Sequence, residues 1–214
     1  MVPDVTSFDE RARDWDTPEH IARAVAVATV IRSVVPLGPT IRALEIGAGT
    51  GLLGLALVAD LGELVLTDPS AGMREVATEK VLRDGLRNVR VASFDLLADP
   101  PPAPETFDLV LASLMLHHVE DTAALLGATF RLLAPGGWIA LADLDTEDGS
   151  FHDPGAEGIH HHGFGRRALR DLAASAGFEA ISFHDATEIE REGRRYPLFL
   201  LTGRRLGEAP QLPA

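Results

Sequence analysis

The sequence has no cysteine, and this absence removes several classes of chemistry. Disulfide bonds, zinc–thiolate sites, iron–sulfur clusters and a cysteine nucleophile are all excluded. Basic residues are also scarce, because 19 Lys and Arg stand against 32 Asp and Glu, for a net charge of −13. A surface of that sign repels a phosphate backbone, so we expect no nucleic-acid substrate.

Targeting patterns and long apolar runs are lacking as well. The first residues show no basic region followed by an apolar stretch. The most apolar helical candidate, residues 21–35, includes two arginines and is too short to span a bilayer. We therefore expect a cytoplasmic protein without a membrane partner. The 214 residues, 46% of them hydrophobic, favour a single domain with a substantial core.

What the sequence does contain is a regular alternation of strand and helix patterns from residue 41 onward. The strand-like apolar runs are 41–46, 63–67, 88–92, 107–112 and 138–143. The helical segments between them are 52–60, 70–82 and 121–133. Strands alternating with helices of this length predict parallel βαβ units with right-handed crossovers.

The last part of the chain departs from this alternation. A helical segment over 166–176 is followed by two strand-like segments, 178–186 and 196–202. The charged segment between them, 187–195, is too short for a crossover helix, so these two strands should pair antiparallel. The sequence thus predicts one antiparallel strand in an otherwise parallel α/β sheet.

A glycine-rich loop follows the first of these strands. In Glu45-Ile-Gly47-Ala-Gly49-Thr-Gly51, three glycines at alternate positions allow a tight turn and the close approach of a ligand. The helix that begins there offers free N–H groups. A dinucleotide fingerprint would place its third glycine at Leu52, so the spacing argues against a nicotinamide cofactor. The preceding glutamate favours a ligand with an ammonium or sulfonium group.

Carboxylates follow the next two strands. Asp68 comes 17 residues after Gly51, where it can accept hydrogen bonds from both hydroxyls of a ribose. Asp95 follows the third strand, where it can accept from an exocyclic amine while Phe94 packs against a base. Open parallel sheets bind their ligands at these carboxyl ends of the strands.

These motifs together resemble those of the class I S-adenosylmethionine-dependent methyltransferases, of the type that acts on small molecules. Besides the glycine loop, the matching segments are 66–68, 94–95, 107–113 and 133–137, in the same order and spacing. The resemblance covers roughly residues 8–203. It implies a Rossmann-like, doubly wound α/β fold of seven strands with the last antiparallel, helices on both faces and a small N-terminal helical lid.

The resemblance also implies a single methyltransferase domain over residues 1–214. Its expected parts are the N-terminal lid and helix (1–37), a cofactor-binding half (38–143), a substrate-side loop (144–165), a C-terminal helix and hairpin (166–203) and a tail (204–214).

The cofactor implied by the resemblance is S-adenosylmethionine. The glycine loop is then expected against the methionine part and Asp68 on the ribose, with Asp95 near the adenine amine. Trp15 is expected to close over the cofactor, and Met73 is either a core residue or an adenine contact. The predicted cofactor-binding residues are Trp15, Glu45, Gly47, Ala48, Gly49, Gly51, Thr67, Asp68, Met73, Phe94, Asp95, Leu96, Ser113 and Leu114.

Histidines near the predicted cleft are the candidates for a general base. His117 follows the fourth strand, and His161 and His162 lie in the loop after the fifth. Each could take a proton from a hydroxyl acceptor or serve only a structural role. Asp143 faces the same opening and either binds the acceptor or caps the loop. We expect no metal site, because adjacent histidines without a carboxylate ligand set chelate poorly.

The sequence therefore predicts methyl transfer from S-adenosylmethionine to a small-molecule acceptor by in-line displacement. One alternative is a nicotinamide-dependent reductase, which the absence of a Tyr-x-x-x-Lys pair disfavours, because the only tyrosine, Tyr196, precedes Pro197. Another is a non-catalytic cofactor-binding module. The identity of the acceptor, its target atom and the oligomeric state cannot be read from the sequence.

Overall fold

The computed structural model describes residues 6–98, 106–153 and 155–207. Parts of the predicted lid (1–5) and of the predicted tail (208–214) lie outside these described residues.

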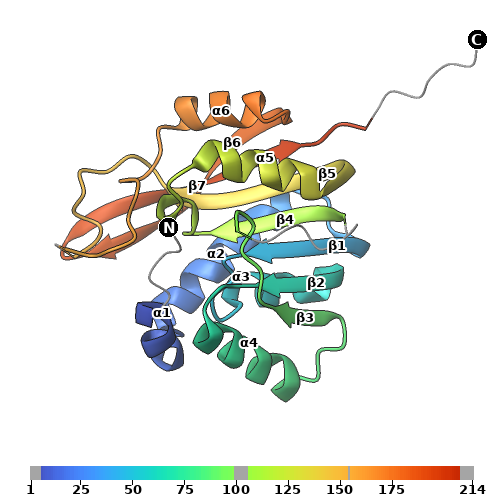
Figure 1. Cartoon of the computed structure of the whole chain (residues 1–214), viewed down its shortest axis with the longest axis horizontal. Coiled ribbons are helices and arrows are strands. Elements are labelled where there is room, and N and C mark those ends of the chain that lie inside the picture. The colour runs from blue at the N-terminus through green and yellow to red at the C-terminus, as the bar shows by residue number, and fades with distance from the viewer. Residues whose placement is uncertain (1–5, 99–105, 154, 208–214) are drawn as a thin grey trace, which may run out of the picture.

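A single mixed sheet organises the described residues (Figure 1). Its seven strands are β1 (Gly38–Ile46), β2 (Leu61–Thr67), β3 (Val89–Ala92), β4 (Phe107–Ser113), β5 (Leu133–Leu144), β6 (Glu179–Arg191) and β7 (Arg194–Arg204). Their order across the sheet is β3-β2-β1-β4-β5-β7-β6, and β7 runs antiparallel to both of its neighbours while the other pairs are parallel. The predicted fold class is confirmed.

Three of the helices begin at a capping side chain. The helices of the described residues are α1 (Thr6–Arg11), α2 (Pro18–Val34), α3 (Leu52–Leu57), α4 (Ala71–Arg83), α5 (Thr122–Leu132) and α6 (Arg166–Ser175), with short 3-10 turns η1 (Ala12–Asp14), η2 (Val58–Asp60) and η3 (Leu116–His118). Thr17, Ser70 and Asp121 each accept a hydrogen bond from the first turn of the helix that follows. Across the described ranges, no helix combines the length and apolar character that a membrane crossing requires.

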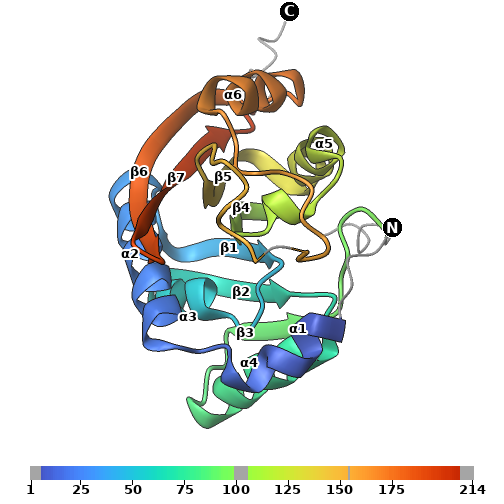
Figure 2. The same cartoon turned by 90° about the vertical axis from the view of Figure 1, so that its left-hand side faces the viewer.

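The helices divide between the two faces of the sheet (Figures 1 and 2). Buried residues of α2, α3 and α4 pack against one face and those of α5 and α6 against the other. Side chains of β1 alternate between the two faces. Ala43 packs in the core under α2, α3 and α4, and Leu44 and Ile46 pack in the core under α5 and α6. Both faces are therefore covered, as the continuous apolar strands predict.

The C-terminal hairpin is longer than the sequence pattern indicates. β6 and β7 continue through the charged segment 187–195 and meet at the two-residue turn Glu192-Gly193, with φ of 51° and 73°. A two-residue turn with positive φ at both positions matches the twist of the paired strands. In this segment, half-buried Thr187 and Ile189 alternate with exposed Glu188, which is the alternation typical of a strand. The many charged residues made this alternation hard to recognise in the sequence.

The topology fixes where a ligand site can form. β1 and β4 are neighbours at the centre of the sheet, and the chain leaves them toward opposite edges. This arrangement is a topological switch point, where open α/β sheets bind ligands beyond the carboxyl ends of the strands. The glycine loop follows β1 at this point, and η3 follows β4.

Truncating a core leucine should cost far more stability than truncating an exposed one. Leu64 of β2 is fully buried, so Leu64→Ala should lower the free energy of unfolding by about 2–5 kcal/mol. Leu82 of α4 is 74% exposed, and Leu82→Ala should change it by less than about 0.5 kcal/mol. Urea unfolding of both variants checks the difference, and equal effects would contradict this assignment of the core.

Candidate active site

The glycine loop between β1 and α3 has the backbone that its sequence predicts. Gly47, Gly49 and Gly51 all have positive φ, at 60°, 55° and 81°. The Gly51 N–H donates to the carbonyl of Ala48 at 2.8 Å, which closes the turn. A Cβ at Gly47 would lie 2.5 Å from Cγ of Met115, so this position has no room for a side chain in the present arrangement.

Two buried carboxylates accept backbone hydrogen bonds from this loop and from the helices next to it. Glu45 accepts a hydrogen bond from Gly54 N–H at 2.9 Å, and burial raises the pKa of its carboxyl to about 8. Asp68 accepts from Gly49 N–H at 2.7 Å and from Ser70 N–H at 2.8 Å. Burial raises the pKa of Asp68, while these two backbone hydrogen bonds oppose the rise. Asp68 thereby ties the glycine loop to the start of α4.

The segment of residues 6–16 lies over the same region, with α1 beside α4 (Figures 1 and 2). Asp9 accepts hydrogen bonds from Ser70 Oγ and from Gly72 N–H, the latter at 2.8 Å. The indole Nε1 of Trp15 lies 3.8 Å from the position that a Cβ would take at Gly49. Trp15 is therefore placed directly beside the glycine loop, as the expected lid requires.

A second polar contact joins this segment to the loop. Lys80 of α4 forms an ion pair with Asp16 and donates to the Thr50 carbonyl at 2.9 Å, and Thr50 Oγ1 also donates to Asp16. Burial lowers the pKa of Lys80, and the hydrogen bond and charge of Asp16 oppose that effect. No local sequence pattern indicates this cluster, because its three residues are far apart in the chain.

The remaining predicted cofactor residues line the ends of β2, β3 and β4. Thr67 Oγ1 donates to the Glu45 carbonyl, and Met73 is buried with its sulfur 3.8 Å from a Cβ position at Gly49. After β3, Phe94 is buried in the core beside Leu96, and Asp95 accepts from two backbone N–H groups of the following turn.

The chain turns sharply at the end of β4. Leu114 follows the half-buried Ser113 and has a φ of 53°, which is uncommon for a residue with a side chain. Its N–H donates to the Ala142 carbonyl at 2.9 Å. The turn places the side chain of Met115 against Gly47, so the segment after β4 contacts the loop after β1.

A buried histidine–carboxylate pair follows this turn. His117 Nδ1 lies 2.7 Å from Asp143 Oδ1, and the two residues are 1% and 0% exposed. Asp143 also accepts from the N–H groups of Leu116 and Leu144 at 2.9 and 2.8 Å. Because a carboxylate faces Nδ1, that nitrogen carries the proton of the neutral ring and Nε2 keeps its lone pair. Asp143 was expected to bind the acceptor or cap the loop, and its pairing with His117 was missed.

Two further imidazoles lie against His117. The ring centroid of His118 is 4.2 Å away, and that of His152, from the loop after β5, is 5.1 Å away. Burial lowers the pKa of each of these two side chains to about 4, so both are neutral at pH 7. Nothing in the sequence pattern around His152 indicates this position.

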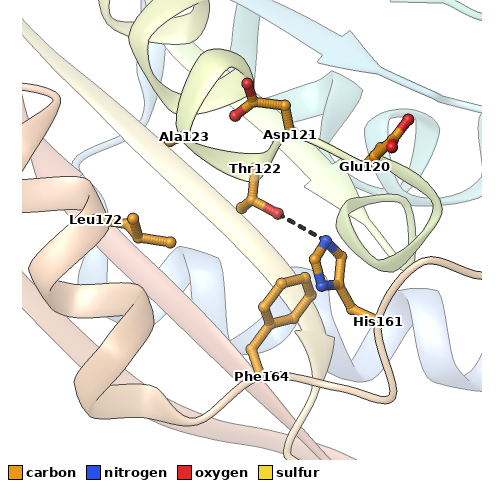
Figure 3. A pocket seen from close by; sticks show the side chains of 7 residues that line it. All are labelled: Glu120, Asp121, Thr122, Ala123, His161, Phe164 and Leu172. Atoms are coloured by element: carbon orange, nitrogen blue, oxygen red, sulfur yellow. Dashed lines mark hydrogen bonds between the residues drawn. The ribbon is translucent and has the colours of Figure 1, made fainter.

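The side chains of the other two histidines that were predicted as bases contact other residues. Figure 3 shows His161 in a surface pocket, with Nε2 3.2 Å from Thr122 Oγ1 and 2.9 Å from the Val119 carbonyl. The pocket is lined by Glu120, Asp121, Thr122, Ala123, His161, Phe164 and Leu172. His162 has a side chain that is 61% exposed, and it lies 3.4 Å from Glu147 Oε1. The His161 N–H donates to the His117 carbonyl at 3.2 Å, so the two backbones adjoin, but the imidazoles of His117, His161 and His162 have different partners. The described residues contain no cluster of three or more metal-ligating side chains.

Comparison with known proteins places the chain in a family. Residues 44–139 match a sequence family described as a methyltransferase domain. The chain is 31% identical over 155 residues to the ubiquinone biosynthesis O-methyltransferase of Paracidovorax citrulli, an alignment that covers 69% of this chain and 64% of that protein. It is 36% identical over 113 residues to a polyketide synthase-nonribosomal peptide synthetase of Aspergillus clavatus, covering 50% of this chain and 3% of that protein.

A solved structure supports the fold. A S-adenosylmethionine-dependent methyltransferase from Aquifex aeolicus superimposes with a TM-score of 0.71 at 17% identity, covering 92% of this chain and 98% of that one. The chain therefore spans nearly the whole of this structural neighbour but less than two thirds of the curated relatives above. The family's cofactor, S-adenosylmethionine, is the one that the motifs predict. By its sequence motifs, its strand order and these similarities, the chain belongs to the class I S-adenosylmethionine-dependent methyltransferases.

Proposed function

We propose that this protein transfers a methyl group from S-adenosylmethionine to a hydroxyl of a small-molecule acceptor. One observation carries the proposal: the glycine loop with Asp68 and the His117–Asp143 pair stand at the carboxyl ends of adjacent strands, and Met115 bridges them by contacting Gly47. A nucleoside site and a candidate base are therefore neighbours. The division expected from the sequence, with a cofactor-binding half over 38–143 and a substrate-side loop over 144–165, is part of this proposal.

The residues present fit the cofactor. The positive-φ glycines leave a backbone cradle without Cβ atoms, and Trp15 and Met73 flank it with apolar surface. Asp68 keeps lone pairs for ribose hydroxyls beyond its two backbone hydrogen bonds, since each carboxylate oxygen can accept more than one. When bound, S-adenosylmethionine supplies a methyl group that is already activated on a sulfonium. The residues predicted from the sequence keep their cofactor-binding roles in this proposal.

His117 is the base that the geometry favours. Asp143 holds Nδ1, fixes the orientation of the ring and stabilises the imidazolium that forms when Nε2 takes a proton. His161 has its Nε2 engaged by α5 and the preceding turn, and His162 is largely exposed. The protein's own contribution is otherwise proximity and alignment of the two reactants.

The comparisons support a small acceptor. The similar protein of P. citrulli is named as an O-methyltransferase of ubiquinone biosynthesis, which modifies an oxygen. The net charge of −13 disfavours polyanionic acceptors, so the prediction of no nucleic-acid partner stays part of the proposal.

Removing the charge of Asp68 should weaken nucleoside binding. Asp68→Asn loses charge-assisted hydrogen bonds to the ribose, so the Kd for S-adenosylhomocysteine should rise about tenfold to a hundredfold. Isothermal titration calorimetry measures this constant. Asp60→Asn is the matched control, because Asp60 precedes β2 at the opposite edge of the sheet and pairs with Arg32. An unchanged Kd for Asp68→Asn would contradict the ribose assignment.

Removing either member of the His117–Asp143 pair should slow the chemical step. His117→Ala and Asp143→Asn should lower kcat about a hundredfold to ten-thousandfold and leave the Kd for S-adenosylhomocysteine within about threefold. Release of S-adenosylhomocysteine with a panel of hydroxylated acceptors measures the rate. His184→Ala, on β6, is the control. Wild-type turnover by both variants would show that the acceptor needs no base from this pair.

The buried Glu45 should make stability depend on pH. The carboxyl has an ordinary pKa of 4.5 in the unfolded chain and about 8 in the folded protein, so the folded state binds more protons between these values. Stability therefore falls as pH rises through this window, by up to about 1.4 kcal/mol per pH unit.

Glu45→Gln should flatten this dependence, because the amide oxygen still accepts from Gly54 and the side chain no longer ionises. Urea unfolding between about pH 5 and pH 8 compares it with Glu63→Gln, a control at a partly exposed position of β2. Equal slopes for wild type and Glu45→Gln would rule out the burial effect on Glu45.

A further inference from the structure

A row of rings in tilted and edge-to-face contact joins the two segments that cover the carboxyl ends of the strands. Neighbouring centroids are 4.2 to 5.9 Å apart along Trp15, Phe8, His118, His117, His152 and Phe151. The first two rings come from the N-terminal segment 6–16 and the last two from the loop after β5. Figure 2 shows α1 and this loop at the same end of the sheet. His117 therefore lies among planar side chains, and planar rings pack favourably against a planar ligand.

His152 is held firmly in this row. The N–H of its neighbour Phe151 donates to Glu147, and the Phe151 carbonyl accepts from Arg191 at 2.5 Å. On the other side of Phe151, Tyr196 Oη donates to the Ser150 carbonyl at 3.1 Å. Contacts from β6 and β7 thus fix the loop, so the ring of His152 has a defined position.

The Nε2 atom of His152 is buried, and none of the described residues forms a hydrogen bond with it. Leaving a buried polar nitrogen unpaired costs free energy, and folded proteins almost always provide a partner. Within the row, the ring next to His152 is His117, the residue assigned as the base. A group on an acceptor bound next to His117 would supply the missing partner.

Building on the function proposed above, we propose that His152 Nε2 binds the oxygen of a planar hydroxylated acceptor, a phenol or an enol. In this arrangement the hydroxyl loses its proton to His117 Nε2. The oxygen forms its bond to the methyl carbon, and the electron pair of the broken carbon–sulfur bond stays on sulfur, which leaves S-adenosylhomocysteine. The neutral imidazole of His152 donates its N–H to the negative charge that develops on the oxygen.

The hydrogen bond from His152 also determines whether an oxygen or a nitrogen atom can be methylated. An oxygen has more than one lone pair, so it can accept from His152 and still attack the methyl carbon. A neutral amine has a single lone pair, and a hydrogen bond from His152 would occupy it. His152 is therefore a specificity-determining residue that favours oxygen over nitrogen acceptors.

Matched probes test the acceptor class by binding alone. 2-Naphthol, 2-naphthylamine and 2-decalol share a carbon skeleton and differ in the polar atom or in planarity. With protein saturated by S-adenosylhomocysteine, calorimetry should show 2-naphthol binding about tenfold more tightly than either of the others. Preference for the amine or the non-planar alcohol would overturn the proposal.

Variants at position 152 test the residue. His152→Phe keeps a planar ring at this position without the nitrogen, so the affinity for 2-naphthol and its kcat/KM should fall about five- to tenfold. His152→Gln restores a donor and should recover both to within about threefold. His184→Phe, on β6, is the control. Because His152→Phe removes an unpaired buried nitrogen, its thermal midpoint should equal or exceed that of the wild type.

The outcomes separate this inference from the function on which it rests. If S-adenosylhomocysteine binds and 2-naphthol does not, or if His152→Phe binds 2-naphthol as tightly as the wild type, Nε2 has no partner on the acceptor and the inference is wrong. If S-adenosylhomocysteine itself does not bind, the proposed function fails.

Discussion

The parallel pairing of β1 with β4 is the constraint on which the rest of the site depends. Ala43, Leu44 and Glu45 pair with residues 109–111, in the most buried part of the sheet. The chain leaves these two strands toward opposite edges, which makes their carboxyl ends a topological switch point. The space that results is bordered by the glycine loop on one side and by η3 on the other. Every functional assignment concerns side chains at the border of this space.

Charge is distributed unevenly around this space. Glu45 and Asp68 lie buried beneath the glycine loop, and Lys80, whose ion-pair partner is Asp16, lies close by. Burial raises the pKa of both carboxyls, which favours their neutral forms. A cationic ligand beside them would favour the ionised forms, and a pyrophosphate would oppose ionisation. A sulfonium nucleoside therefore matches this loop better than a pyrophosphate does.

The sequence predicted the features that depend on neighbouring residues. Strand and helix order and the glycine turn follow from local patterns, and the structure bears them out. Features that depend on distant residues were missed. The pairing of His117 with Asp143 joins residues 26 positions apart, and the contact of His152 with His117 depends on a loop without periodicity. The hairpin was predicted too short because its charged residues concealed the alternation of half-buried positions.

The N-terminal segment, residues 6–16, is attached to the rest of the fold with little buried surface. Of residues 6–16, Ala12 alone is buried, and the segment is held to the loop and to α4 chiefly by side chains such as Asp9 and Asp16. Neither hydrophobic cluster beneath the sheet's two helical layers includes a residue of this segment. Its detachment is therefore a local event, with a free energy well below that of global unfolding. Access to the interior and the integrity of the fold are thus controlled by separate sets of contacts, and selection can adjust one without weakening the other.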